Sequence, residues 1–202
     1  MHRSIYLLGA WFVAALAARA QFVTPVSYTE SSIGGSGEFT YFDTTPPSKL
    51  TDGVFGVDNW AADLGHGPAA EWVGWSDGEN PTLAFTFAGT ATIDQVHIDF
   101  NRSDENGIFL PTNITVNGTD FTVAADAIPN DTRGSLSFNG PWTGNSIVVG
   151  LTAVDNTSTN FVFIDEMQFA GEVVPEPQAY AAAVGLVVLG AVAWRRRRNL
   201  LG

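Results

Sequence analysis

The chain has 202 residues, with 21 acidic and 9 basic side chains and no cysteine. This length is enough for one folded domain with a buried core. The acidic balance argues against nucleic-acid binding, which needs a basic surface, and the lack of cysteine excludes disulfides, thiolate zinc sites and thiol nucleophiles.

Residues 1–20 have the pattern of a secretory signal peptide. A basic start at Arg3 precedes an apolar run over residues 5–16, and the small residues Ala18 and Ala20 suit a signal peptidase. We therefore predict cleavage before Gln21 and export of the remaining chain. The alternative is a retained membrane anchor, for which the run is short.

Residues 173–202 contain a second targeting pattern. The triplet Pro175, Glu176 and Pro177 precedes an uncharged stretch over residues 179–194. Four arginines follow this stretch: Arg195, Arg196, Arg197 and Arg198. At about 1.5 Å per residue a helix of this length nearly crosses the hydrocarbon core, and arginine side chains can reach the interface. Arginine clusters stay cytoplasmic, so we predict a transmembrane helix that leaves residues 21–172 outside.

This order of Pro-Glu-Pro triplet, apolar helix and arginine cluster resembles the PEP-CTERM sorting signal. The resemblance implies a bacterium with an outer membrane and an exosortase that cuts at or near the triplet. It also implies a transient inner-membrane anchor, followed by release to the cell surface or the extracellular polysaccharide matrix. A plain tail anchor is the alternative.

Residues 21–172 form the domain between the two signals. Helical periodicity is not sustained anywhere in it, whereas short alternations of apolar and polar residues recur, as at 83–87, 93–100 and 161–166. His97 alternates with apolar neighbours and is predicted to face outward or toward a groove. We predict an all-β fold, an antiparallel jelly-roll sandwich of seven or eight strands.

Three local patterns make this fold prediction more specific. Asn117-Gly118 predicts a two-residue hairpin, and Asn139-Gly140-Pro141 predicts a turn. The continuous apolar run over residues 147–151 predicts a strand buried on both faces. Trp72 and Trp75 are three residues apart in a predicted strand and should point to opposite faces.

Six short motifs follow one another in a characteristic order. They are Lys49–Gly53, Glu71–Trp75, Phe87–Gly89, Ile93–Ile98, Leu110–Pro111 and Phe163–Phe169. Together they resemble the galactose-binding-like jelly roll of discoidin (coagulation-factor C-type) domains and related carbohydrate-binding modules over about residues 40–170. The resemblance implies a domain that binds carbohydrate.

The same resemblance implies a structural calcium ion beside the Asp-Gly turn. Asp52 and Glu166 match the carboxylate positions of the family, and backbone carbonyls near Leu50 and Val54 would be the other donors. A hard cation prefers six to eight oxygen ligands, which a turn can supply. The alternative is that Asp52 only opens a turn and that Glu166 is solvated.

Sugar recognition needs aromatic faces and planar polar side chains. The candidates in loop-like sequence are Trp60, His66, Arg102 and Trp142. For Arg102 the alternative is a buried or paired structural role, and for His66 it is an exposed loop position.

Sequence patterns of catalysis are missing. There is no G-x-S-x-G motif, no histidine metal motif and no carboxylate pair in a glycosidase-like context. We therefore predict a non-enzymatic, exosortase-sorted surface or matrix protein whose sandwich associates with extracellular polysaccharide. The alternative is a structural or adhesion protein with no dedicated ligand site, and a hydrolase is the least supported reading.

Overall fold

The computed structural model describes residues 21–31, 41, 43, 48–56, 60, 71–76, 78–154 and 160–174. The predicted signal peptide and the chain from Pro175 onward, including the predicted sorting helix, lie outside these residues. Within the described residues, no helix has the length and apolar character needed to cross a membrane.

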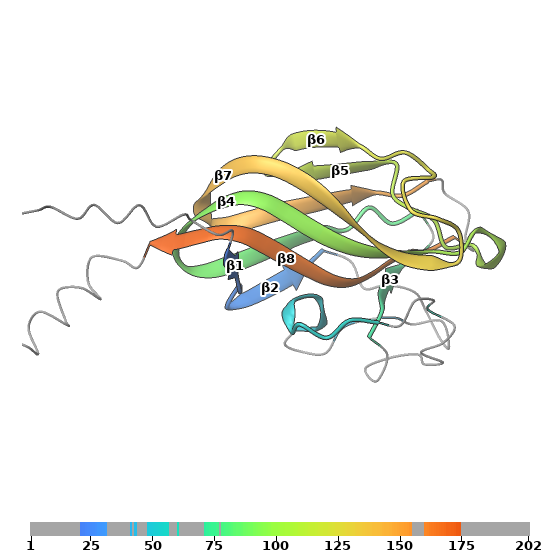
Figure 1. Cartoon of the computed structure of the whole chain (residues 1–202), viewed down its shortest axis with the longest axis horizontal. Helices are drawn as coiled ribbons and strands as arrows, with labels where there is room; N and C mark the ends of the chain where they lie inside the picture. The colour runs from blue at the N-terminus through green and yellow to red at the C-terminus, as the bar shows by residue number, and fades with distance from the viewer. Residues whose placement is uncertain are drawn as a thin grey trace, which may run out of the picture.

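Strands account for most of the described chain (Figure 1). The elements in chain order are β1 (Gln21–Val23), β2 (Ser27–Glu30), the 3₁₀ helix η2 (Lys49–Thr51), β3 (Val73–Trp75), β4 (Thr82–Arg102), the 3₁₀ helix η5 (Asp104–Asn106), β5 (Asn113–Val116), β6 (Thr119–Thr122), β7 (Thr132–Thr152) and β8 (Val162–Val174). Their order in the sheet is β1-β8-β4-β7-β5-β6, with β2 also on β4 and β3 also on β8. Every pairing between these strands is antiparallel, which confirms the predicted all-β antiparallel class.

Two long strands create the two layers of the sandwich. β4 and β7 have 21 residues each and pair along most of their length. Their pairing is interrupted after Thr86, opposite Ser146, and resumes at Ala91, opposite Gly144. Both strands curve around at the left of Figure 1. The first half of β4 pairs with β2 and the second half with β8, so the bent strands contribute to both layers.

The turn predicted at Asn139-Gly140-Pro141 is wrong, because these residues lie within β7. Asn139 is opposite Gln95 and Trp142 is opposite Ile93, so a pairing irregularity absorbs the residues between them. A Cβ atom on Gly140 would lie 2.6 Å from the Ile93 carbonyl oxygen, which only a glycine allows. Residues typical of turns here serve a bulge in a bent strand and not a chain reversal.

The segment from Ile147 to Leu151 is buried on one face only, which corrects the prediction of burial on both. Ile147, Val149 and Leu151 are in the core, whereas Val148 is 37% exposed. The outer face of an antiparallel layer can be open to water, and an apolar residue on it breaks the expected alternation without being buried.

The Asn117-Gly118 hairpin is confirmed between β5 and β6. Val116 is opposite Thr119, which leaves a two-residue loop. Asn117 and Gly118 have φ angles of 46° and 80°, as the mirror-image turns of such hairpins require. The Asn117 side chain also accepts a hydrogen bond of 2.8 Å from the Val148 amide, which ties the hairpin to β7.

Aromatic rings join the two layers in the core. Phe169 of β8 packs against Phe85 and Phe87 of β4, with ring centroids 4.8 Å and 5.4 Å apart. Trp75 belongs to this main core, whereas Trp72 packs in a second buried cluster that includes Phe163. The prediction that the two tryptophans point to opposite faces is therefore confirmed.

Replacement of Phe169 by alanine should destabilise the domain by about 3–5 kcal/mol, because it leaves a cavity where three rings meet. Phe22→Ala on the neighbouring strand is the matched control, because the Phe22 side chain is 52% exposed, and it should cost about 1 kcal/mol or less. Chemical denaturation measures both, and similar losses in the two variants would contradict this account of the core.

Candidate functional site

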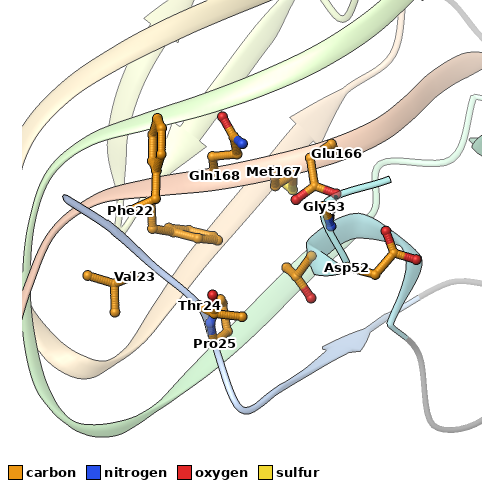
Figure 2. A pocket seen from close by; sticks show the side chains of 11 residues that line it. Phe22, Val23, Thr24, Pro25, Asp52, Gly53, Glu166, Met167 and Gln168 are labelled. Carbon is orange, nitrogen blue, oxygen red and sulfur yellow. Dashed lines mark hydrogen bonds between the residues drawn. The ribbon is translucent and has the colours of Figure 1, made fainter. Parts of the chain in front are cut away.

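A recess of about 220 Å³ lies beside β8, between the segment that contains β1 and the turn that follows η2 (Figure 2). One wall consists of residues 22–25, from the end of β1 and the loop after it. The other wall consists of residues 51–53, from the end of η2 and the turn after it. Glu166 and Gln168 line it from β8, alternating with Met167 and Phe169, whose side chains belong to the core. Figure 2 shows Phe22 and Gln168 rising on the same side of the β8 ribbon.

Asp52 and Glu166, the two residues predicted to bind calcium, line this recess together. The Gly53 amide donates to Glu166 Oε2 at 3.1 Å, and the Val54 amide donates to Asp52 Oδ1 at 2.8 Å. Asp52 thus does open the turn, and Gly53 permits it with a φ of 78°. Glu166 is only 3% exposed, so the alternative that it is solvated is wrong.

The environment of Glu166 disfavours its charged form. Burial raises the pKa of Glu166 to about 8, although the hydrogen bond from Gly53 opposes this shift. The carboxylates of Asp52, Asp165 and Asp99 raise the pKa further. A bound cation would remove this penalty by neutralising the carboxylate.

Arg133 pairs with two further buried acids, Asp165 and Asp99, next to the same turn. Its Nε atom donates to Asp165 Oδ2 at 2.7 Å, and its Nη2 atom lies 3.1 Å from Asp99 Oδ1. The Gly56 amide also donates to Asp165 Oδ2 at 2.6 Å, and the Phe55 ring centroid lies 4.5 Å from the guanidinium carbon. The residues from Gly53 to Gly56 are therefore held onto β8 by side chains of the sheet.

A pairing irregularity in β8 explains why consecutive acids contact this turn. Asp99 is opposite Glu166 and Phe100 is opposite Ile164, which leaves Asp165 as the extra residue of a bulge. A bulge re-aims a side chain that simple alternation would send to the other face. Burial raises the pKa of Asp165 to about 6, and the ion pair with Arg133 opposes this shift.

The chemistry of these donors fits a hard divalent cation. Asp52 and Glu166 offer carboxylate oxygens, and the recess has no basic side chain in its lining. Across the described parts of the chain, however, no three or more acidic or histidine side chains converge as metal ligands. Backbone carbonyls and water would have to complete the coordination shell.

Of the other predicted ligand residues, the three that the structure describes, Trp60, Arg102 and Trp142, pack against separate partners. Trp60 packs on Tyr41 and Phe163, with ring centroids 6.3 Å and 5.9 Å apart. Trp142 is 7% exposed and packs against Phe121 near the bend of β7. His66 lies outside the described residues.

Arg102 has the paired arrangement that was the alternative to ligand binding. Its Nε and Nη2 atoms donate to the two carboxylate oxygens of Asp104 at 2.8 Å and 2.6 Å, and Nη1 donates to the Ile128 carbonyl at 2.9 Å. The hydrogen bonds that Arg102 donates to the Asp104 carboxylate raise the pKa of Arg102. The guanidinium thus stabilises the loop around η5.

Sequence reasoning missed the residues that accompany the recess on the outer face. Phe22 and Gln168 lie on strands, whereas the predicted ligand residues were those in loop-like sequence. His97 was predicted to face outward or toward a groove, and this is confirmed by its edge-on contact with the half-exposed Phe22 ring at 5.5 Å. The signal for Gln168 was its polar position within the apolar last strand.

Solved structures similar to this chain include carbohydrate-binding proteins. A fucose-binding module from Streptococcus pneumoniae aligns at 13% identity over 76% of this chain and 96% of that chain, with a TM-score of 0.45. The C-terminal domain of a chitobiase from Bacteroides fragilis aligns at 16% identity over 76% and 99%, with a TM-score of 0.45. The Streptococcus pneumoniae β-galactosidase BgaA aligns at 10% identity over 76% and 100%, with a TM-score of 0.49. At these scores the likeness alone assigns neither a family nor a ligand to the chain. No family model and no curated protein matches it.

In calcium-free buffer, stability should decrease as the pH rises from about 4.5 to about 8. The unfolded chain releases the Glu166 proton at its ordinary pKa of 4.5, whereas the folded chain keeps it until about pH 8, so rising pH favours unfolding. Glu166→Gln should show a shallower decline, measured as the denaturation free energy across this range.

Glu172→Gln is the matched control for this pH series, because Glu172 is an exposed acid on the same strand. It should behave like the wild type. A decline in Glu166→Gln as steep as in the wild type would show that another group causes the pH dependence.

Proposed function

We propose that this chain is an exported, non-catalytic protein whose β-sandwich associates with extracellular polysaccharide. The observation that carries the proposal is the recess on β8, where the half-exposed Phe22 ring accompanies the Gln168 amide. A ring can stack on the C–H face of a sugar, and an amide can both donate to and accept from neighbouring hydroxyl groups. A concave site with a few such polar groups is typical of small-ligand binding.

The pairing of β1 with β8 supports the proposed processing. Gln21 is opposite Gly171, so residues next to the two proposed cleavage sites lie side by side on adjacent strands. We infer that signal peptidase and an exosortase cut just outside this strand pair, and that the sandwich then passes from a transient inner-membrane anchor to the cell surface or matrix.

We also propose that calcium binds between Asp52 and Glu166. The support is the buried Glu166 carboxylate, which has Gly53 as its hydrogen-bond donor and faces a recess without basic side chains. The ion would fix the Thr51–Gly53 turn on β8, which is a structural role. The carbonyls near Leu50 and Val54 would be the remaining protein donors.

A structural matrix or adhesion protein without a ligand site is the second candidate. It is favoured by the burial of Trp142 and the pairing of Arg102 with Asp104, because these contacts give two predicted ligand residues packing roles. The two candidates differ in whether the sandwich binds glycan.

The binding proposal is tested by affinity electrophoresis of the full chain in mild detergent. Gels would contain neutral polymers (dextran, galactomannan and hydroxyethyl cellulose) or anionic ones (alginate and polygalacturonate). At least one polymer should retard the chain. Phe22→Ala removes the exposed ring of the recess, so the affinity derived from the retardation should fall about tenfold. No retardation in any gel would favour the structural candidate.

Calcium should raise the melting temperature by several degrees over that in chelator, as expected for a ligand that binds only the folded state well above its dissociation constant. Glu166→Gln should lose this response, while Glu172→Gln should keep it. A melting temperature that does not change with chelator would argue against the site.

A further inference from the structure

The strand register places two rows of mostly polar residues across the outer face, the first over four strands and the second over three. The first row runs across β1, β8, β4 and β7, and its residues are, in that order, Phe22, Ala170, Gln95 and Asn139. In the second row, Gln168, His97 and Ser137 are opposite one another on β8, β4 and β7. We call six of these residues the neutral stripe: Phe22, Gln95, His97, Ser137, Asn139 and Gln168.

The six residues of the neutral stripe are at least partly exposed, whereas Ala170, which lies between Phe22 and Gln95 in the first row, is buried. Phe22 is half-exposed, Ser137 and Asn139 are exposed, and Gln95 and His97 are partly so. Residues that alternate with them, such as Val96, Ile98, Phe138 and Phe169, belong to the core. The stripe therefore lies on a rigid layer whose other side is fully packed.

Contacts within the stripe hold its side chains in place before any ligand arrives. Gln95 Nε2 donates to Asn139 Oδ1 at 2.7 Å, and Ser137 Oγ lies 2.8 Å from His97 Nδ1. The Phe22 ring meets the His97 ring edge-on, at an angle of 79°. Gln95 Oε1, Asn139 Nδ2 and His97 Nε2 are then the polar atoms that can meet a ligand. Fixed side chains lower the entropy cost of binding.

Charge limits the class of ligand. None of the six residues is an acid, a lysine or an arginine, although the domain has 20 acidic and only three basic side chains. The next row on one side contains Glu166 and Asp99, which the 53–56 turn and Arg133 cover, and Asp94 lies at the irregularity on the other side. The acidic surplus of the whole domain disfavours an anionic chain, and an ammonium group would find no carboxylate within the stripe.

We propose that the neutral stripe binds an internal stretch of an extended, uncharged polysaccharide chain lying across β1, β8, β4 and β7. Four adjacent strands span about 14 Å, which accommodates several consecutive sugar units. The Phe22 ring and Gln168 amide hold the chain at the recess, and Gln95, Asn139 and His97 contact the units beyond it. This inference rests on the proposed glycan binding. It adds that the binding surface is a face of the sheet and that the part of the polysaccharide recognised is an internal stretch and not an end.

The test uses the full chain in mild detergent and the neutral polymer that retards it most in the gels. Oligosaccharides from a partial hydrolysate of that polymer, from the monosaccharide to the hexasaccharide, are titrated by calorimetry. Affinity should rise with length until the stripe is filled, and should not change between low and high salt, because the ligand is uncharged. Asn139→Ala should weaken binding of the longer chains about tenfold, as loss of a hydrogen-bonding group does.

Asn145→Ala is the matched control, because it removes an exposed amide from the same strand outside the stripe, where the pairing of β7 with β4 is interrupted, and it should bind as the wild type does. Thermal melts confirm that both variants fold. Equal affinity for the monosaccharide and the hexasaccharide, or binding that survives Asn139→Ala but is lost in Trp60→Ala, would overturn the inference while glycan binding stands. Retardation by alginate alone would also overturn the inference. Retardation by no polymer would overturn both the inference and the proposed function.

Discussion

The register between β8 and β4 is the constraint on which the rest of the structure depends. It places Phe169 against the Phe85 ring in the core, and on the other face it aligns Gln168 with His97. Side chains alternate between faces, so a slip of one residue would expose Phe169 and bury Gln168. The core and the outer face are thus consequences of one pairing, and the energy that fixes the register comes from the aromatic contacts inside.

The bulge at Asp165 produces the acidic end of that outer face. By adding one residue to β8, it lets Asp165 and Glu166 both contact the 53–56 turn, through the amides of Gly56 and Gly53. Three buried carboxylates there, Asp99 included, have one arginine to pair with them, so part of the charge is neutralised by protonation or by a cation. The turn that forms one wall of the recess therefore depends on how this charge is compensated.

Local sequence patterns predicted the fold class well. The alternation in β4 and the Asn117-Gly118 pair each specify a structure within a few residues, and both are confirmed. The pattern at Asn139-Gly140-Pro141 misled, because a bulge in a bent strand uses the same residues as a turn. The expectation that Asp52 and Glu166 lie at the same site came from the family resemblance, and not from a local sequence pattern. The stripe could not be predicted, because Gln95 and Asn139 are 44 residues apart and share a face only through the register.

The outer face combines two effects that act over different distances. The acidic surplus of the domain acts at long range, where it opposes the approach of anionic polymers and weakens as salt is added. The neutral stripe, in the role proposed for it, would act only on contact, through a ring and amides whose interactions with an uncharged chain do not depend on salt. In a matrix of mixed polysaccharides, the charges would reject the wrong class of polymer before contact and the stripe would retain the right one. Selectivity would then depend on two features of the domain: its acidic surplus, and six adjacent surface positions that contain no acid, lysine or arginine.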